Sequence, residues 1–473
     1  MIQNRNLNEI QKELNSGKLL LVDAVKYYLD KISSQKHLNV FISVFENDAL
    51  TRAEEIQKKI NSGTAGKLAG LVISVKDVIT IKDKLHTCGS KILSNYTSVY
   101  NATVIERLIS EDAIIIGKVN CDEFAMGSSN ENSYFGAVLN PVDNSRVPGG
   151  SSGGSAVSVA ADMCMVSLGS ETGGSIRQPA SFCGITGLKA TYGRISRFGL
   201  TAFASSFDSI GIFGKNDYDI AAVLEVISGE DEYDSTSAKE KVPEFTVETG
   251  NNIKPGEIIF GYAKEYFEDG LNEEIKNGIL KKIEFLKNKG FEVKEISLPH
   301  SKYVIQTYYI LTSAEASSNL ARYDGVRFGF KSENHSNLEE MYVNTRSEGF
   351  GAEVKRRIML GTYVLSSGYY DAYYKKGQKM RRKITEDFEN AFKEVDYIIS
   401  PTTPTTAFKL GEKNDDPLAM YLNDIYTASV NLAAIPAISV PAGNDSNGLP
   451  FGIQIMGKKF DEAGLLKVSK LFI

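Results

Sequence analysis

The segment 148–179 carries two clusters of serine flanked by glycine, separated by a mostly apolar stretch. The first cluster reads GGSSGG around Ser151, and the second reads TGGS and ends at Ser175. Glycine lets the backbone approach another molecule closely, and the amide N–H groups of such loops can meet negative charge that develops on a substrate. Two loops of this kind, close together in one chain, predict the walls of an active site and argue against a flexible linker.

Short apolar runs around these loops predict buried strands of an α/β sheet. The runs at 68–79 and 112–120 are bounded by Gly, Asp or Asn, and another apolar stretch ends near Phe213. Residues 1–62 instead place apolar side chains at helical spacing, until Asn-Ser-Gly at 61–63 ends the pattern. The N-terminal region is therefore expected to be helical.

The second half of the chain predicts a return to the sheet after a helical region. Residues 230–250 are polar and charged, which indicates a surface excursion. Residues 303–395 are mostly helical in pattern and rich in tyrosine and arginine. Further strands are expected at 257–262 and 290–297, around one helix, and at 395–404, 435–443 and 449–457. The pattern predicts one α/β sheet domain that carries helical additions.

The composition is that of a globular protein and gives no sign of nucleic-acid or membrane binding. The chain has 473 residues, of which 42% are hydrophobic and 24% charged, as in ordinary globular proteins with a large core. Its net charge of −6 provides no basic footprint for nucleic acid, so any RNA is expected to be held mainly by a partner protein. No apolar run is long enough to span a bilayer, and the first residues lack a signal-peptide core, so we expect no membrane association.

The cysteines point to a reducing compartment. They form no CxxC pair and have no histidine nearby at metal-ligand spacing. Four cysteines in a chain of this length are typical of free thiols in the cytosol, so a cytoplasmic protein without a metal site is expected. They are Cys88, Cys121, Cys164 and Cys183.

Lys76 is the first candidate catalytic residue. It ends the apolar run LVISVK and is expected to lie at the end of a buried strand. Burial of a lysine disfavours its charged form and lowers its pKa toward that of a useful base. The alternative is an ordinary lysine paired with Asp77 or Asp83.

Ser151 fits two further patterns. Gly-Gly-Ser-Ser-Gly at 149–153 matches G-x-S-x-G, the nucleophile elbow of α/β-hydrolases, which needs a later acid and histidine. The later histidines are His300 and His335, both in polar loop contexts. The loop and the helix expected after it could also cradle a phosphate, although the usual G-K-[ST] ending is missing.

Ser175 follows two glycines, which lets several successive N–H groups point into one space. That arrangement suits an oxyanion hole, in which each donor contributes roughly 3–4 kcal/mol of transition-state stabilisation. A tight turn with a capping serine is the alternative explanation.

The three motifs together resemble the amidase signature family: Lys76 in SVKDVI, Ser151 in PGGSSGGSA and Ser175 in GSETGGSIRQPA. The resemblance covers essentially the whole chain. It implies that Ser175 is the nucleophile, that Ser151 relays its proton and that neutral Lys76 is the base. It also implies a cis peptide bond between Gly150 and Ser151. The implied oxyanion hole consists of N–H groups from Thr172, Gly173, Gly174 and Ser175.

The same resemblance implies the amidase signature fold, with one large mixed central sheet flanked by helices on both faces. Residues 1–473 are then expected to form a single domain. Its parts would be an N-terminal helical segment, the signature core with the triad, a helical excursion with substrate-pocket residues, and a C-terminal return to the sheet. These segments span 1–62, 63–215, 216–395 and 396–473.

Segments outside the triad resemble the branch of the family that hydrolyses L-glutamine and supplies ammonia for conversion of Glu-tRNA(Gln) to Gln-tRNA(Gln). They lie at 119–136, 315–329, 353–382 and 423–441. The resemblance implies a heterotrimer whose B subunit holds most of the Glu-tRNA(Gln) and activates it with ATP and Mg²⁺. A small C subunit clamps the pair, and this chain itself needs no cofactor. A free-standing amidase for small amides and a non-catalytic scaffold are the alternatives, although an intact triad argues against the scaffold.

A pocket for glutamine needs a cation for the α-carboxylate and an acid for the α-ammonium, with Arg favoured for its fork of donors. By resemblance we expect Arg357 to bind the carboxylate, with Arg356 as the neighbour it could be confused with. Asp424 is expected to bind the ammonium, and Tyr309 to line the pocket. The alternatives are a solvated basic helix at 355–357 and a helix N-cap at Asp424.

Other residues near the motifs carry weaker expectations. A stretch of three residues is expected to shape the pocket wall through backbone groups: Met126, Gly127 and Ser128. Arg177 is expected to order the turn after Ser175, and Cys121 to serve packing. The basic run 375–383 is interpreted as a solvated helix face and not as an RNA contact.

Overall fold

The computed structural model describes residues 5–248, 253–268, 270–413 and 416–472. Its centre is one sheet of eleven strands in the order β1-β3-β2-β4-β6-β5-β10-β11-β9-β7-β8. The strands are β1 (Phe41–Val44), β2 (Val72–Lys76), β3 (Ile114–Val119), β4 (Val166–Glu171), β5 (Thr186–Lys189), β6 (Ser209–Gly214), β7 (Ile259–Ala263), β8 (Glu292–Ile296), β9 (Tyr397–Pro401), β10 (Ala437–Asn444) and β11 (Pro450–Met456). All strands expected from the apolar runs are present, and the α/β prediction is confirmed.

The sheet is mixed, as the resemblance implies. Strands β3, β2 and β4 run parallel to one another near one edge, where β1 pairs antiparallel with β3, and β9, β7 and β8 run parallel to one another at the other edge. The strands between these two groups pair antiparallel. Every residue of β2, β4, β6, β9 and β11 is buried. Because successive side chains of a strand point to opposite faces, both faces of the sheet are covered.

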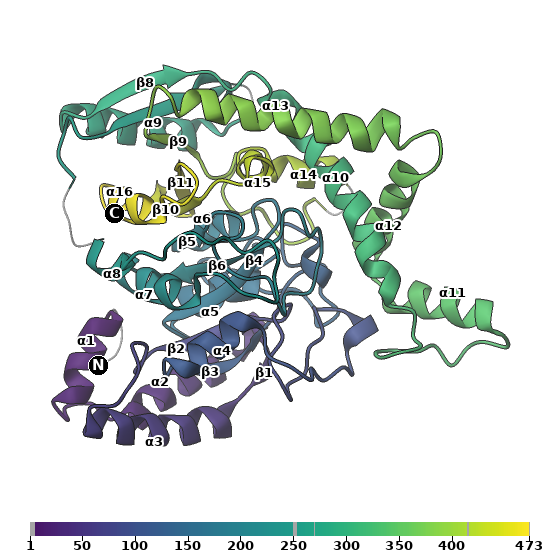
Figure 1. Cartoon of the computed structure of the whole chain (residues 1–473), viewed down its shortest axis with the longest axis horizontal. Coiled ribbons are helices and arrows are strands. Elements are labelled where there is room, and N and C mark those ends of the chain that lie inside the picture. Colours follow the sequence, from purple (N-terminus) through teal and green to yellow (C-terminus); the bar gives the residue numbers. More distant parts are fainter. Residues whose placement is uncertain (1–4, 249–252, 269, 414–415, 473) are drawn as a thin grey trace.

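Helices cover the sheet along its width (Figure 1). The α-helices are α1 (Leu7–Asn15), α2 (Leu21–Ser34), α3 (Glu46–Ser62), α4 (Thr103–Ser110), α5 (Gly153–Ala160), α6 (Arg177–Cys183), α7 (Asp217–Ile227), α8 (Phe245–Glu248), α9 (Glu273–Asn288), α10 (Val304–Asn319), α11 (Leu338–Gly349), α12 (Ala352–Leu365), α13 (Lys376–Ala391), α14 (Pro417–Tyr421), α15 (Ala428–Ala433) and α16 (Glu462–Ser469). Helix α3 packs on β3, α5 on β4, α7 on β6, and α6 on β10 and β11.

The N-terminal region differs from its helical pattern in one element. Strand β1 lies between α2 and α3 and pairs antiparallel with β3, with Phe41 opposite Val119. Its four residues are too few to show a strand period in the sequence. The strand exists because β3 offers it an unpaired edge, which is a tertiary effect.

The helical region after β8 leads away from the sheet and returns to it. Figure 1 shows α11 projecting from the rest of the molecule, while α10, α12 and α13 connect it back to the core. Helix α12 packs closely along α10, and both α10 and α13 contact α15. One contiguous hydrophobic cluster extends from Leu7 to Phe472. None of the helices in the described ranges combines the length and apolar character needed to span a membrane.

Candidate active site

Lys76 is the last residue of β2 and is fully buried between β3 and β4. Its Nζ lies 2.8 Å from Ser151 Oγ and 2.8 Å from Ser152 Oγ, and 3.0 Å from Ser170 Oγ. Asp77 does not pair with it, because Asp77 pairs with Lys118 at 2.6 Å. Burial lowers the pKa of Lys76 to about 8. The prediction of a desolvated lysine at a strand end is confirmed, and the pairing with Asp77 is not found.

Ser151 lies in the loop before α5, and the Gly150–Ser151 peptide bond is cis at the place that the resemblance implies. Its carbonyl accepts the N–H of Asp122 at 3.1 Å, and the N–H of Gly150 donates to Gln178 Oε1 at 2.9 Å. These bonds tie the loop to the 122–130 segment and to α6. The loop therefore holds the Ser151 hydroxyl toward Lys76.

Neither alternative for this loop is favoured by its contacts. The Ser151 side chain bonds Lys76, whereas the His300 ring lies 2.9 Å from Asp387 on α13. At the start of α5, the N–H of Gly154 donates to Asn120 O and Asn130 Oδ1. An N–H group that is already bonded cannot bind a phosphate, so the N–H of Gly154 is not available to one.

Ser175 lies in the turn that connects β4 to α6. Its exposed fraction is 8%, whereas Lys76 and Ser151 are 0% exposed, so Ser175 is the accessible member of the three. The N–H groups of Gly173, Gly174 and Ser175 find no acceptor within the described part of the protein. Free amide donors beside an accessible hydroxyl suit an oxyanion hole. The assignment of this hole to residues 172–175 stays a prediction.

The turn is held from both ends by buried carboxylates. Thr172 Oγ1 donates to Asp208 Oδ1 at 2.7 Å, and burial raises the pKa of Asp208 to about 7. At the other end, Glu171 Oε2 accepts the N–H groups of Ile176 at 3.0 Å and Arg177 at 3.2 Å. The backbone between these anchors is therefore restrained without use of its own N–H groups.

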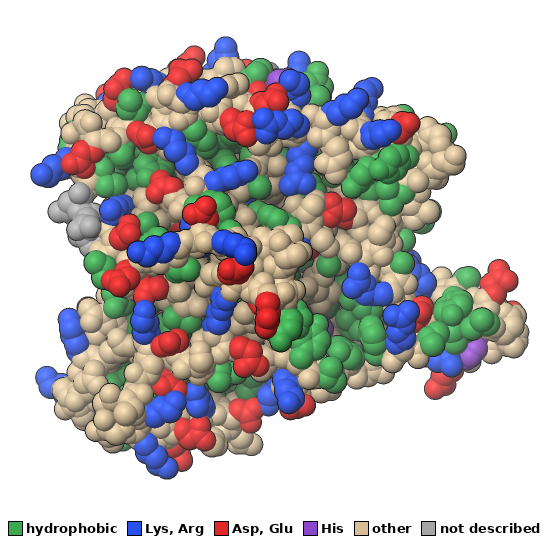
Figure 2. Space-filling model, in the orientation of Figure 1, with side chains coloured by type: hydrophobic (Ala, Val, Ile, Leu, Met, Phe, Trp, Pro, Cys, Tyr) green, Lys and Arg blue, Asp and Glu red, His purple; other side chains and the backbone are tan. Residues whose placement is uncertain are grey.

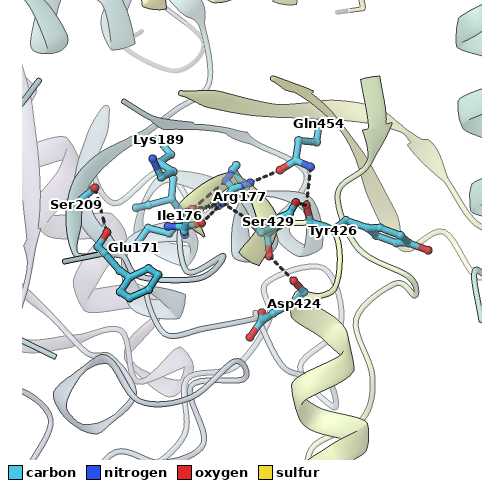
Figure 3. A network of polar contacts seen from close by, with 12 residues as sticks. Glu171, Ile176, Arg177, Lys189, Ser209, Asp424, Tyr426, Ser429 and Gln454 are labelled. Atoms are coloured by element: carbon cyan, nitrogen blue, oxygen red, sulfur yellow. Dashed lines mark hydrogen bonds and ion pairs between the residues drawn. The ribbon is translucent and has the colours of Figure 1, made fainter. Parts of the chain in front are cut away.

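Arg177 joins the turn to distant parts of the chain (Figure 3). Its guanidinium pairs with Glu171 and with the Gln454 side chain of β11, and it donates to Thr427 O at 3.0 Å. Although burial alone would raise it, Arg177 holds the pKa of Glu171 below its usual value. These contacts agree with the expectation that Arg177 orders the turn.

Asp424 lies next to this turn, in a 3-10 helix at Leu422–Asp424. A Cβ added to Gly174 would lie 3.2 Å from Asp424 Oδ1 and 2.3 Å from Thr427 Oγ1, so only glycine allows this approach. Asp424 Oδ2 accepts the hydroxyls of Ser128 at 2.9 Å and Tyr309 at 3.3 Å. Burial raises the pKa of Asp424 to about 6. The side chain caps no helix, in contrast to the alternative explanation.

Arg357 lies on α12 with its side chain 4% exposed, whereas that of Arg356 is 47% exposed. Its Nε donates to Glu353 Oε1 at 2.8 Å. The guanidinium carbon lies 4.9 Å from the centre of the Tyr309 ring and 5.5 Å from that of Tyr421. Arg357, and not Arg356, therefore faces the aromatic residues beside Asp424. A solvated basic helix does not describe its position.

The expected pocket wall at 126–128 has different contacts at each residue. Met126 is fully buried, and a Cβ on Gly127 would lie 2.3 Å from Asp122 Cγ. Ser128 reaches Asp424 with its hydroxyl and accepts the Gln178 Nε2 bond at 2.7 Å with its carbonyl. Their roles toward substrate stay predictions. Ser128 contacts Asp424 through its side chain, whereas its backbone carbonyl contacts Gln178 of α6.

Several residues around the site were not predicted from the sequence. Glu353 and Tyr421 surround Arg357, Asp208 holds the turn, and Ser152 and Ser170 bond Lys76. Glu353 had a readable signal, since it precedes Arg357 by four positions on one helix face. Ser152 and Ser170 lie inside the motifs around Ser151 and Ser175. Asp208 and Tyr421 had no signal, because a lone Asp or Tyr is most often a surface or packing residue.

The charges outside the site are mixed. Figure 2 shows Lys and Arg side chains interspersed with Asp and Glu side chains on the face in view. In the basic run, Arg382 pairs with Glu386 and Glu389, as expected of a solvated helix face. Arg381 differs, because it packs 4.1 Å from the centre of the Phe207 ring. Cys121 is fully buried, and the four cysteines are free.

An α/β sheet with a buried lysine, two serine loops and a cis Gly–Ser bond defines an amidase signature enzyme. The family described as "Amidase" matches residues 23–466, and the chain belongs to this family. No group of three or more His, Cys, Asp or Glu side chains in the described ranges is arranged to hold a metal ion.

The relatives within the family are more specific. The chain is 53% identical to the A subunit of glutamyl-tRNA(Gln) amidotransferase of Chlorobium phaeobacteroides (strain BS1), over 98% of this chain and 97% of that protein. It is 54% identical to the protein of the same name from Koribacter versatilis (strain Ellin345), over 94% and 93%. Among solved structures, it is similar to the A subunit of glutamyl-tRNA(Gln) amidotransferase from Thermotoga maritima. That match has a TM-score of 0.80, 38% identity and coverage of 99% of this chain and 94% of that one.

Proposed function

We propose that this chain is the glutaminase subunit of a Glu-tRNA(Gln) amidotransferase, which hydrolyses L-glutamine and supplies ammonia to a partner. The observation that carries the proposal is the contact of buried Lys76 with Ser151, whose loop is bonded to the helix that follows the Gly-Gly-Ser175 turn. Asp424 lies beside that turn, and Tyr309 contacts both Asp424 and Arg357. The relatives named above carry the name of such an amidotransferase, and they match over nearly their full length. A pocket with one buried cation and one buried carboxylate suits an α-amino acid better than a simple amide.

In the proposed mechanism, the Ser175 hydroxyl attacks the side-chain amide carbon of glutamine. Its proton passes to Ser151 while the Ser151 proton passes to neutral Lys76. The oxyanion that forms accepts hydrogen bonds from N–H groups of the 172–175 turn. As the C–N bond breaks, the proton returns to the leaving nitrogen, so ammonia departs and a γ-glutamyl ester of Ser175 remains. Water then cleaves this ester by the same relay and releases glutamate.

The relay has a physical basis in the surroundings of Lys76. Because its pKa is lowered to about 8, a sizeable fraction of the lysine is neutral near pH 7.5 and can accept a proton. Hydroxyls hold its amine without adding a negative charge that would stabilise the protonated form. No histidine is needed.

The partners are part of the same proposal. The B subunit would hold and activate Glu-tRNA(Gln) with ATP and Mg²⁺, and the small C subunit would clamp the two larger chains. This chain would bring no cofactor of its own. The resemblance and the names of the relatives support this assembly.

The test is ammonia release from L-glutamine by the chain purified with the partners that bind it, beside its Ser175→Ala variant. Release that disappears in the variant, and that increases with ATP and Glu-tRNA(Gln), is the expected result. Turnover of simple amides without turnover of L-glutamine would instead favour a free-standing amidase. Normal assembly and normal growth of cells carrying only Ser175→Ala would favour a scaffold.

A further inference from the structure

The Arg357 guanidinium is incompletely paired in a buried position. Its side chain is 4% exposed, and it packs against the rings of Tyr309, Tyr421 and Phe203. Its hydrogen bond runs from Nε to Glu353 Oε1. The two terminal nitrogens find no acceptor among the residues that the structure describes. A buried guanidinium with an unused fork suits a planar anion such as a carboxylate.

The hydrogen bond to Glu353 determines which edge of the Arg357 guanidinium remains free for another acceptor. A guanidinium can present its Nε edge or its terminal fork to a bidentate acceptor. The bond at 2.8 Å occupies Nε with Glu353, four positions earlier on the same helix. Without that bond the side chain can rotate, and both edges become available. The order of the Arg357 fork therefore depends on Glu353.

Glu353 is itself held in place by other donors. The Tyr421 hydroxyl donates to the same Oε1 at 3.1 Å, and Arg356 pairs with Oε2. The Tyr421 ring stacks on Tyr309 with ring centres 3.8 Å apart. Tyr309 in turn bonds Asp424 at 3.3 Å. The cation and the acid of the pocket are thus joined by one continuous set of contacts.

We propose that Glu353 is a positioning residue for substrate specificity, which aims the terminal fork of Arg357 at the α-carboxylate of the amino-acid substrate. This inference rests on the proposed function and deepens it. Glu353 touches no substrate and takes no part in the chemical step. It acts through Arg357, so its loss weakens recognition of the carboxylate and leaves the reaction at Ser175 intact.

The experiment compares two substrates in the intact complex. L-glutamine carries the α-carboxylate, and 4-aminobutanamide is the same molecule without it. For Glu353→Ala, we expect the KM for L-glutamine to rise about tenfold, which corresponds to the loss of one charge-assisted hydrogen bond. We expect kcat for L-glutamine, and kcat/KM for 4-aminobutanamide, to stay within about twofold.

Two further variants sharpen the result. Glu353→Gln retains an acceptor oxygen and should recover part of the lost affinity. Glu339→Ala makes the same substitution at an exposed position of α11 and should change neither substrate's kinetics. Thermal unfolding of each variant shows that it is folded.

The outcomes separate the inference from the proposed function. An unchanged KM for L-glutamine in Glu353→Ala, with the unsubstituted protein active, overturns the inference alone. Equal losses with both substrates assign Glu353 a purely structural role and also overturn it. Absence of ammonia release from L-glutamine by the unsubstituted complex overturns both proposals.

Discussion

Lys76 of the triad and Arg357 of the adjoining pocket are held by opposite electrostatic means. Around Lys76 the contacts are serine hydroxyls and one carbonyl, and burial lowers the lysine pKa to about 8. Beside Arg357 the carboxylate of Glu353 supports the positive charge and raises the pKa of the guanidinium in spite of its burial. A lysine that acts as a base must be able to lose its proton, whereas a cation that binds a carboxylate must keep its charge. Adjacent sites in one protein can therefore require opposite surroundings.

The residues of the triad and those of the pocket also come from different parts of the chain. The triad comes from strand ends and loops between residues 76 and 175, within one half of the sheet. The pocket takes Tyr309 from α10, Arg357 from α12 and Asp424 from a turn before α15, with Ser128 from the other half. The catalytic residues are therefore positioned by the sheet, and the substrate-binding residues by the packing of helices against it.

The largest effect on activity is expected from substitution of Ser175, which should abolish the reaction and leave substrate binding intact. Ser175→Ala removes the nucleophile and should lower kcat for glutamine hydrolysis by roughly 10⁴-fold or more. Because the pocket is untouched, the Kd for L-glutamine measured by calorimetry should stay within about threefold. Substantial residual turnover in a carefully purified variant would show that another group carries out the attack.

The Lys76 side chain should set the pH dependence of the reaction. Its neutral form is the base, and the neutral fraction grows as pH rises through about 8, so kcat should increase over that range. Lys76→Met should lower kcat by about 10³-fold and abolish this rise. A rate profile that is flat between pH 7 and 9 in the unsubstituted protein, with chemistry rate-limiting, contradicts the assignment.

Asp424 should affect recognition and leave chemistry largely unchanged. Asp424→Asn removes the charge expected to pair with the substrate ammonium and should raise the KM for L-glutamine about 30-fold or more. In the unsubstituted protein, KM should also rise as pH falls through about 6, because Asp424 becomes protonated there. Steady-state kinetics from pH 5 to 8 test both effects, and a loss in kcat alone would place Asp424 outside the pocket.

Gly361 tests whether helix packing positions the pocket. A Cβ on Gly361 of α12 would lie 1.9 Å from Ser313 O of α10, so Gly361→Ala must push the two helices apart. We expect the free energy of unfolding to fall by about 1–3 kcal/mol. The KM for L-glutamine should rise with little change in kcat, because Arg357 and Tyr309 lie on these helices.

The matched control for Gly361 is Met359→Ala on the same helix, where the side chain is exposed. It should leave both Tm and KM nearly unchanged. A Gly361→Ala protein with normal stability and normal KM would show that α12 adjusts freely, and would argue against helix packing as the means by which the pocket is positioned.

The smallest effect is expected on the exposed face of α13. Arg382→Ala removes ion pairs with Glu386 and Glu389 that are open to solvent. Exposed pairs of this kind contribute little, so neither Tm nor the kinetic constants should change measurably. A marked loss of ammonia transfer in the complex, with glutaminase activity retained, would instead identify this face as a partner contact.

The part of the site that could be predicted from the sequence is the part whose residues lie in short, recognisable motifs. Lys76, Ser151 and Ser175 each lie in a short motif with glycines or a strand end beside it, and their neighbourhood follows from that local chain. The role of Arg357 over Arg356 came only by resemblance, because both lie in one basic run. Their exposed fractions of 4% and 47% depend on how α12 packs against α10.

The sequence by itself determined most of the sheet strands, the helical region after residue 303 and the two glycine-serine loops, because burial, period and glycine are local properties. It did not predict β4 or β5 as strands, nor β1, which forms only because β3 has a free edge. Nor did it determine the contacts that place Tyr421 against Glu353 and Arg357, or Asp208 beside the turn. Those contacts join residues far apart in the chain, and their free energy exists only once the helices and the sheet have packed.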